Sequence, residues 1–144
     1  MIRQISDITV RKRAVVSGED IREHYRQIEG TPHFLPITRY LSGKRVELLI
    51  AEGEGSPEEF VARMRKLVGK SDPAECRRGQ IRHLAVEYGL PYIIPMRPEN
   101  GSNNYCRDNL IHCSDSPENA VREVGIWFDD LDVLWRYACL PKSR

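Results

Sequence analysis

The chain has no long apolar run and almost no net charge, and each absence excludes a class of protein. No stretch approaches the roughly 20 apolar residues that cross a bilayer, so we expect no integral membrane protein. The opening residues, MIRQISDITVRKR, contain no uninterrupted apolar segment, which argues against a secretory signal peptide. The 22 basic and 21 acidic residues leave a net charge of +1. This balance argues against a dedicated nucleic-acid-binding protein.

Cysteine pairs at metal-ligand or redox spacing are also missing. The chain has four cysteines: Cys76, Cys106, Cys113 and Cys139. None of them forms a CxxC pair, so a zinc ribbon or a thioredoxin-type site is unsupported, and we predict no metal held by protein side chains. Reduced thiols in a cytoplasmic protein are the expected state.

The 144 residues, of which 40% are hydrophobic, predict a single domain spanning residues 1–144. Periodicity and turn residues predict strands at 5–16, 45–52 and 109–112, and helices at 17–30, 37–41, 56–69, 116–128 and 131–137. The segments 31–35 and 70–108 are expected to be irregular. This alternation of strands and helices predicts an α/β or α+β architecture, with helices packed on one sheet.

Three of the expected helices begin with recognisable caps. Ser17 is followed three residues later by Asp20, and Ser56-Pro57 and Ser116-Pro117 each combine an N-cap serine with proline at the first helical position. On the helix after Ser116, the predicted core face consists of Val121, Val124, Trp127 and Phe128.

The most informative segment reads Asn-Leu-Ile-His-Cys-Ser-Asp-Ser and begins at Asn109. It places His112 between an apolar stretch and the N-terminus of a predicted helix. Free N–H groups at a helix N-terminus favour anions, and a neutral imidazole there can attack a phosphoryl group. Glu123, further along that helix, could orient the ring and fix its tautomer. By itself the pattern also fits a structural histidine.

This segment, together with Glu123 and the Gly-Ile-Trp-Phe run after it, resembles the active-site signature of nucleoside diphosphate kinases. The similarity continues in order along the chain, over residues 5–137. Its other matching positions are His24-Tyr25, Pro32, Phe34, Tyr40, Ser42-Gly43, Arg65, Gly69, Ser71-Asp72-Pro73-Ala74 and Gly79-Gln80-Ile81-Arg82. The resemblance implies an α+β fold, with a ferredoxin-like antiparallel sheet covered by helices.

The resemblance also implies that the chain transfers the terminal phosphate of an NTP to an NDP through a phosphohistidine. It assigns catalytic roles to His112, Glu123, Ser114 and Tyr25. It implies that Arg65, Ser71 and Arg82 contact the nucleotide phosphates. It also implies that Asn109 contacts the ribose and that His33 stacks on the base. It further implies Mg²⁺ bound through the nucleotide phosphates, a homo-oligomer built from dimers, and a cytoplasmic location.

Three features depart from the family pattern. The family's first strand, which ends in Lys-Pro-Asp-Gly, has no counterpart, and Lys12 lies where it cannot replace that lysine. Cys113 stands at a usual glycine, which predicts crowding or an altered turn. Residues 83–108 are longer than their counterpart, which suggests a different oligomer. The departures keep a second hypothesis open, a weak or inactive relative that serves as a nucleotide-binding or oligomeric module. A thiol or metal protein is a weaker third.

Overall fold

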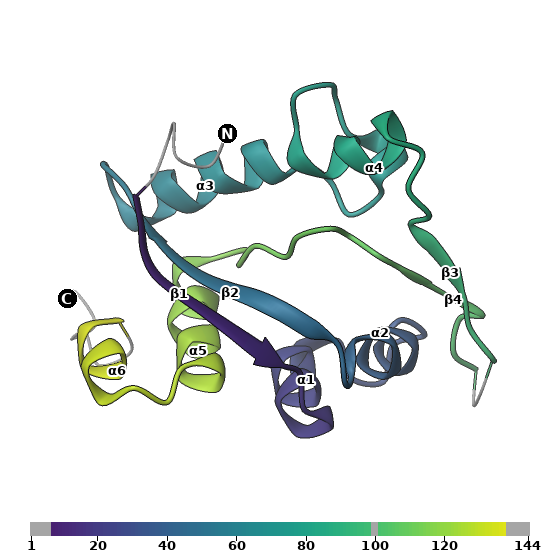
Figure 1. Ribbon diagram of the computed structural model, residues 1–144, viewed down its shortest axis with the longest axis horizontal. Coiled ribbons are helices and arrows are strands. Elements are labelled where there is room, and N and C mark those ends of the chain that lie inside the picture. The colour runs from purple at the N-terminus through teal and green to yellow at the C-terminus, as the bar shows by residue number, and fades with distance from the viewer. Residues whose placement is uncertain (1–6, 99–100, 138–144) are drawn as a thin grey trace.

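The computed structural model of the chain, which describes residues 7–98 and 101–137, contains two separate antiparallel ladders; helices lie around the longer one, and the shorter one projects at one end of the molecule (Figure 1). The strands are β1 (Asp7–Val15), β2 (Arg45–Glu52), β3 (Ile93–Pro95) and β4 (Tyr105–Arg107). The helices are α1 (Gly18–His24), α2 (Phe34–Leu41), α3 (Pro57–Val68), α4 (Leu84–Glu87), α5 (Pro117–Trp127) and α6 (Leu131–Tyr137), with 3₁₀ turns at η2 (Arg26–Ile28), η3 (Pro73–Glu75) and η4 (Ile81–His83). The predicted α+β class is confirmed. Among the described helices, none combines the length and the apolarity needed to cross a membrane.

The longer ladder pairs β1 with β2, and α1 and α2 are inserted between these strands. The register runs from Asp7 opposite Glu52 to Val15 opposite Arg45, with an irregularity between Ile8 and Val10. Exposed and half-buried residues alternate along β1, which confirms the predicted half-exposed strand. In the described part of the chain β1 pairs only with β2, so it lies at a sheet edge as predicted.

The caps inferred from the sequence set the starts of the long helices. The amide of Glu59 donates to Ser56 Oγ at 3.2 Å, and the Ser56 amide donates back to the Glu59 carboxylate at 3.0 Å. This capping box starts α3. Ser116 Oγ accepts from the Asn119 amide at 3.1 Å and starts α5. These two helices confirm the predicted positions because their caps are local in sequence.

The first two helices differ from the prediction. The helix expected over 17–30 ends at His24 and continues as the 3₁₀ turn η2. Arg122 donates to the carbonyls of Glu23 and His24, which are acceptors that a longer helix would have used. Helix α2 begins at Phe34, three residues before the predicted start. Pro36 lies in its first turn, where the missing N–H has no intrahelical acceptor to lose.

The strand predicted at 109–112 is wrong. These residues form no ladder and cross the molecule as an irregular segment between β4 and α5 (Figure 1). A strand needs a neighbour to receive its backbone hydrogen bonds, and neither described ladder provides one for this segment. Leu110, predicted to be buried, is exposed and has a φ of +20°. Val121 is also exposed, although it was placed on the core face of α5.

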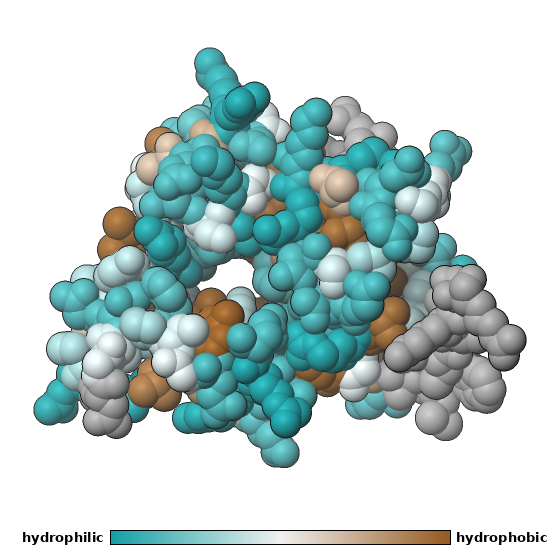
Figure 2. All heavy atoms as spheres, turned by 180° about the vertical axis from the view of Figure 1, so that it is seen from behind, coloured by the Kyte–Doolittle hydropathy of each residue, from teal (hydrophilic) through white to brown (hydrophobic). Residues whose placement is uncertain are grey.

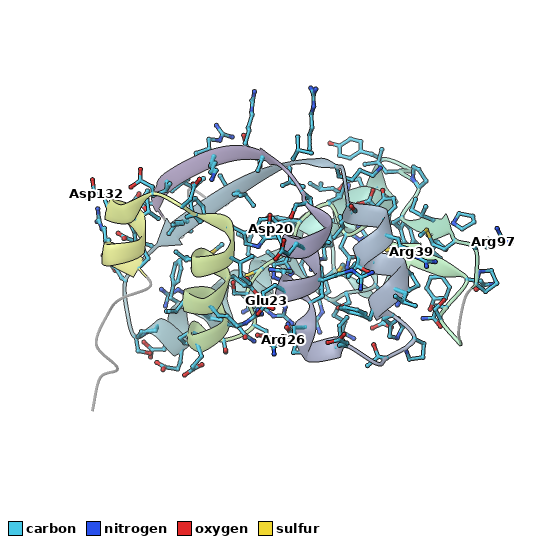
Figure 3. All side chains as sticks on the ribbon, turned by 90° about the horizontal axis from the view of Figure 1, so that it is seen from below. Asp20, Glu23, Arg26, Arg39, Arg97 and Asp132 are labelled. Atoms are coloured by element: carbon cyan, nitrogen blue, oxygen red, sulfur yellow. The ribbon has the colours of Figure 1, made fainter. Side chains whose placement is uncertain are left out.

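Residues 70–108 are more regular than predicted. They contain η3, η4, α4 and the β3–β4 hairpin, in which Ile94 lies opposite Cys106. Beyond the hairpin, the Asp108 amide donates to the Tyr92 carbonyl at 2.9 Å. In Figure 3, Arg97 beside this hairpin and Asp132 on α6 lie at opposite ends of the molecule. The hairpin therefore projects from the side opposite α6.

The core consists of apolar residues from most elements, among them Val16, Ile21, Phe34, Ile50, Met64, Val68, Ala85, Cys106 and Phe128. The packing leaves an opening near the centre of the molecule (Figure 2). His24, Thr38, Arg82 and Glu123 are buried although they are polar or charged. Because a buried polar group needs a hydrogen-bond partner, these side chains are expected to form hydrogen bonds inside the protein. Three of them, all except Thr38, lie around the segment that carries His112.

Candidate active site

His112 lies four residues before Ser116, the N-cap of α5, and its ring contacts Glu123 on that helix. Its Nε2 lies 3.3 Å and 3.2 Å from the two carboxylate oxygens of Glu123. Ser114 Oγ donates to Glu123 Oε2 at 2.5 Å. The His112 side chain is 41% exposed, whereas that of Glu123 is 9% exposed. A buried carboxylate thus orients a ring that is itself partly exposed to solvent.

The contact with Glu123 determines the tautomer of His112. A carboxylate accepts hydrogen bonds, so in the neutral ring the proton lies on Nε2 and the lone pair on Nδ1. Nδ1 is then the nitrogen that can attack an electrophile without losing a proton first. The geometry therefore makes His112 a candidate nucleophile with the carboxylate that orients it already in place.

The surroundings keep Glu123 ionised. Burial alone would raise the pKa of its carboxyl, but the hydrogen bond and charge of His112, with the hydroxyl of Ser114, offset burial and lower the pKa below its usual value. Arg122 adds a guanidinium nitrogen 3.9 Å from Glu123 Oε1. The carboxylate therefore remains an acceptor for His112 at neutral pH.

Tyr25 and His24 cover the inner side of the His112 ring. The centroid of the Tyr25 ring lies 6.1 Å from that of His112, and the centroid of the His24 ring lies 4.5 Å away. Burial, followed by the charge of Glu123, raises the pKa of Tyr25 to about 12, so the phenol stays neutral. The structure thus brings the four predicted catalytic residues together and adds His24, for which the sequence suggested no role.

Two arginines border the same segment. Arg65 donates to the Cys113 carbonyl at 3.4 Å. Arg82 is buried, and it donates twice to the Ile111 carbonyl, at 3.1 Å and 3.0 Å, and once to the Gly69 carbonyl at 3.2 Å. Within the described residues neither arginine is paired with a carboxylate. Two neighbouring cations without an anionic partner favour an anion at this position.

Gly69 allows the close packing that places Arg82. Its φ is +96°, and a Cβ there would come within 2.7 Å of Cys76 Sγ. Glycine is therefore required both for the backbone angle and for the close approach. The turn after α3 then directs the Gly69 carbonyl to Arg82.

The remaining predicted nucleotide contacts lie outside this cluster. Ser71 is exposed next to Asp72, and His33 is exposed just before α2, with its Nδ1 2.8 Å from Asn103 Nδ2. Among the described residues no hydrogen bond or ion pair joins Ser71 or His33 to His112. Asn109 Oδ1 is buried and has no hydrogen-bond partner in that part of the chain. The roles assigned to these three residues stay predictions.

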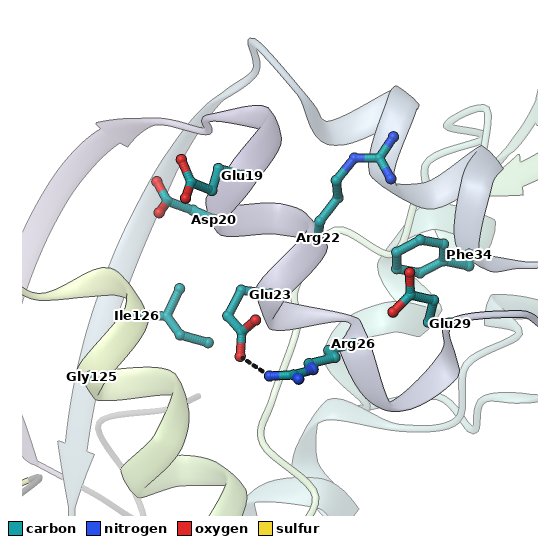
Figure 4. A pocket seen from close by; sticks show the side chains of 9 residues that line it. All are labelled: Glu19, Asp20, Arg22, Glu23, Arg26, Glu29, Phe34, Gly125 and Ile126. Carbon is teal, nitrogen blue, oxygen red and sulfur yellow. Dashed lines mark hydrogen bonds and ion pairs between the residues drawn. The ribbon is translucent and has the colours of Figure 1, made fainter.

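A pocket of about 480 Å³ lies elsewhere, on the outer side of α1 (Figure 4). Glu19, Asp20 and Glu23 line it together with Arg22, Arg26, Glu29 and Phe34, and Gly125 and Ile126 of α5 close one side. Glu23 and Arg26 face each other at 3.5 Å in this pocket. None of the residues that line it is among those predicted for catalysis or nucleotide binding, so it is distinct from the site at His112.

Comparison with known protein families gives a match to the model described as nucleoside diphosphate kinase, over residues 2–133. The chain belongs to the nucleoside diphosphate kinase family. It is 35% identical over 109 residues to nucleoside diphosphate kinase II, chloroplastic, of Arabidopsis thaliana, an alignment that covers 75% of this chain and 38% of that protein. It is 31% identical over 119 residues to a nucleoside diphosphate kinase of Bacillus licheniformis, which covers 83% of this chain and 66% of that protein.

Solved nucleoside diphosphate kinases share the fold. The enzyme of Encephalitozoon cuniculi, in its apo form, aligns with a TM-score of 0.66 at 23% identity, over 89% of this chain and 73% of that one. The enzyme of Borrelia burgdorferi, bound to vanadate and ADP, aligns with a TM-score of 0.63 at 23% identity, over 89% and 73% of the two chains. The likeness supports the predicted ferredoxin-like fold. The chain spans between 38% and 66% of the length of the first three curated relatives that it matches.

Two departures from the family pattern can be examined in the structure. Cys113 stands at the family's usual glycine, yet outside glycine only Leu110 has a positive φ among the described residues. The turn at Cys113 therefore does not require glycine. Lys12 is engaged at the C-terminal end of α5, where its Nζ lies 2.6 Å from Asp129 Oδ1 and 3.4 Å from the Trp127 carbonyl. This pairing agrees with the prediction that Lys12 does not serve as the family's phosphate-binding lysine.

Proposed function

We propose that this chain is a nucleoside diphosphate kinase that carries a phosphoryl group on His112. The observation that supports this most strongly is the hydrogen bond from His112 Nε2 to Glu123, itself bonded by Ser114. In the neutral ring this arrangement places the proton on Nε2 and leaves the lone pair on Nδ1. The reaction proceeds in two half-reactions, in which an NTP phosphorylates His112 and an NDP then removes the phosphate.

In the first half-reaction the lone pair of His112 Nδ1 attacks the terminal phosphorus. The bond from that phosphorus to the bridging oxygen breaks, its electron pair stays on the leaving NDP, and no proton leaves Nδ1. The Nε2 proton remains shared with Glu123, whose negative charge stabilises the cationic ring as the new bond forms. The second half-reaction reverses these steps with another NDP as acceptor.

The arginines supply the positive charge that phosphoryl transfer needs. Arg65 is exposed beside the Cys113 carbonyl and can move onto a phosphate. Arg82 is buried, so in this structure it orders residue 111 directly before the nucleophile. We propose that Arg82 acts on the nucleotide both by its charge and through this backbone contact. Ser71, Asn109 and His33 complete the proposed nucleotide site.

Magnesium fits this site only through the nucleotide. Glu123, the buried carboxylate beside His112, is already occupied by the imidazole and by Ser114, so it is not free to ligate a hard cation. Mg²⁺ held by the nucleotide would neutralise part of the charge on its phosphates. We accordingly propose that the protein binds a nucleotide–Mg²⁺ complex and does not provide a metal cage. We further propose a single domain over residues 1–144, a homo-oligomer built from dimers, and a cytoplasmic location.

The second candidate is a family relative with little or no transfer activity. It is favoured by one observation, that the ammonium group of Lys12 is paired with Asp129. Such a protein would bind nucleotides, or assemble through its surface, without rapid turnover.

Labelling distinguishes the two candidates. With radiolabelled ATP and Mg²⁺, the proposed enzyme forms a phosphoprotein that is acid-labile and base-stable, as phosphohistidine is. His112→Ala abolishes the label, whereas His83→Gln, at a histidine outside the cluster, keeps it. Transfer to GDP then removes the label from the protein. Nucleotide binding without any label would instead support the inactive relative.

A further inference from the structure

Helix α5 contributes more to the site than the carboxylate of Glu123. Arg122 donates to the carbonyls of Glu23 and His24 at 3.0 Å and 3.1 Å, which ties the end of α1 to α5. Four residues after Glu123, Trp127 Nε1 donates to His24 Nδ1 at 3.0 Å. Glu123 and Trp127 lie on one face of the helix because they are four positions apart. Arg122 lies on the neighbouring side of the helix, towards the end of α1. One rigid element therefore sets the positions of both His24 and His112.

The bond from Trp127 determines the tautomer of His24. An indole N–H can only donate, so His24 Nδ1 must accept and the ring proton must lie on Nε2. A doubly protonated His24 would lose this bond, because both of its nitrogens would be donors. The residue is only 4% exposed, so water is not available to replace the lost partner.

His24 in turn packs against the candidate nucleophile. The ring centroids of His24 and His112 are 4.5 Å apart with an interplanar angle of 77°, which is an edge-to-face contact. Glu123 lies against Nε2 of His112. The His112 ring is thus confined by a carboxylate and by a neutral ring edge. Rotation about its side-chain bonds would break one contact or collide with the other.

We propose that His24, held by Trp127, is a positioning residue that confines the His112 ring with Nε2 at Glu123 and Nδ1 free for phosphoryl transfer. This role rests on the proposed function, because it concerns the same nucleophile. It extends the site beyond the carboxylate and serine, to two residues that are 103 positions apart in the sequence. His24 acts through His112 and does not itself touch the phosphoryl group.

A metal site is the main alternative for this cluster. One ring nitrogen from each of His24 and His112 and one oxygen of Glu123 lie within 4.8 Å of one another. A metal needs an unprotonated nitrogen on His24, but Nδ1 is occupied by Trp127 and Nε2 carries the proton. The Trp127 bond therefore favours a positioning role over metal ligation.

The burial of His24 and the charges around it also favour a positioning role, because together they keep its ring neutral. The titratable or charged groups that face it are Tyr25 and His112, whose rings pack against it, and Glu123 and Arg122 on α5. Burial, followed by the charge of His112, lowers the pKa of His24 to about 4, although Glu123 opposes this shift. His24 therefore stays neutral over the pH range in which a kinase works, and it places no second positive charge beside the phosphohistidine.

The test uses Trp127→Phe, which keeps an aromatic ring and removes the N–H donor. Long-range ¹H–¹⁵N NMR of the folded protein reads the tautomer of each histidine. We expect Nε2–H for His24 in the native protein, and a mixture of tautomers in the variant. Tyr137→Phe is the matched control, because it removes one hydrogen bond from Tyr137 on α6 to Thr9 on β1 and touches neither His24 nor His112. It should leave the His24 signal unchanged.

The functional readout is the rate at which His112 is phosphorylated between pH 5.5 and 8. Two donors are compared, ATP with Mg²⁺ and the small donor phosphoramidate, whose P–N bond breaks as the imidazole attacks and whose nitrogen leaves as ammonia after taking a proton from water. Trp127→Phe should slow labelling about 10-fold or more with both donors. The loss should be larger at pH 6 than at pH 8, because His24 becomes easier to protonate.

His24→Asn provides a second variant in case Trp127→Phe does not fold. Its amide oxygen can still accept from Trp127, but the ring edge against His112 is gone, so labelling should slow while thermal stability changes little. A changed tautomer with unchanged labelling rates by phosphoramidate would overturn the positioning role. Labelling of the native protein by phosphoramidate but not by ATP would count against the proposed kinase, while the comparison of variants would still decide the role of His24.

Discussion

Arg82 donates two hydrogen bonds to the carbonyl of Ile111, the residue directly before His112. The third bond of its guanidinium goes to Gly69, at the end of α3. A buried cation therefore connects the turn after α3 to the segment that carries the nucleophile. Since that segment lacks a ladder of its own, these side-chain bonds replace the backbone pairing that a strand would have.

Removing this connection should destabilise the fold. Arg82→Ala leaves the carbonyls of Ile111 and Gly69 without their donors, and we expect a loss of about 2–3 kcal/mol in the free energy of unfolding. Urea denaturation measures it. Arg65→Ala is the control, because Arg65 is exposed and its loss should cost about 0.5 kcal/mol or less. Equal stability of the two variants would show that the Arg82 bonds are not structural.

Histidine 24 should make stability depend on pH. Its pKa is about 4 in the folded protein, compared with 6.5 for an ordinary histidine such as one in the unfolded chain. The unfolded chain therefore binds more protons between these values, so the folded state loses stability as pH falls from about 6.5 to about 4. The full loss from this residue is roughly 3 kcal/mol. Urea titrations at several pH values should show a shallower decline for His24→Asn, and an identical decline would contradict the assignment.

Local features of the sequence predicted the local features of the structure. The capping serines, each followed by proline, specify α3 and α5 because a cap involves only four neighbouring residues. The strand predicted at 109–112 failed because apolar sequence does not reveal whether a pairing partner lies alongside. The hairpin of β3 and β4 was missed because its strands have only three residues each and include Pro95.

The site was predictable only in part, because local sequence patterns do not show which distant residues come into contact. The pairing of His112 with Glu123 followed from the motif and its family resemblance. The bond from Trp127 to His24 did not, because tertiary packing alone brings these residues together. The burial of Arg82 was equally invisible, since an arginine in a polar segment predicts an exposed side chain. A signal for His24 existed, because it directly precedes Tyr25 in a position that matches the family.

The base-binding prediction can be tested at His33. Its ring is exposed and held by Asn103, from the long segment between β3 and β4. Stacking of a base on an aromatic ring contributes about 1–3 kcal/mol, so His33→Ala should weaken ADP binding by roughly 5- to 150-fold. Calorimetry measures the affinity, and His83→Gln is the control. An unchanged affinity would place the base elsewhere.

Oligomer contacts are predicted in residues 83–108. Exposed apolar side chains gather there, at Val86, Tyr88, Leu90 and Ile93. Replacing Tyr88, Leu90 and Ile93 together by serine should lower the mass measured by light scattering at micromolar concentration. Val15→Ser is the matched control, because Val15 is also an exposed apolar residue but lies on β1. A native mass for the triple variant would exclude this surface from the assembly.

Cys113 gives a prediction opposite to the one that the family pattern suggests. Its backbone does not have the positive φ that favours glycine, and its carbonyl already accepts from Arg65. Cys113→Gly therefore relieves no strain and adds disorder to the unfolded chain, which should cost about 0.5–1 kcal/mol relative to Cys113→Ala. If crowding limited the reaction, glycine would raise the rate of His112 labelling more than alanine does. We expect equal rates for the two variants, because the side chain of residue 113 is not what orients the His112 ring.

Burial also raises the pKa of the Cys113 thiol despite the nearby arginines. Alkylation by iodoacetamide at pH 7 should accordingly be slower in the folded protein than in urea, and fast alkylation of Cys113 would show that the thiol is more open and more acidic than its surroundings indicate.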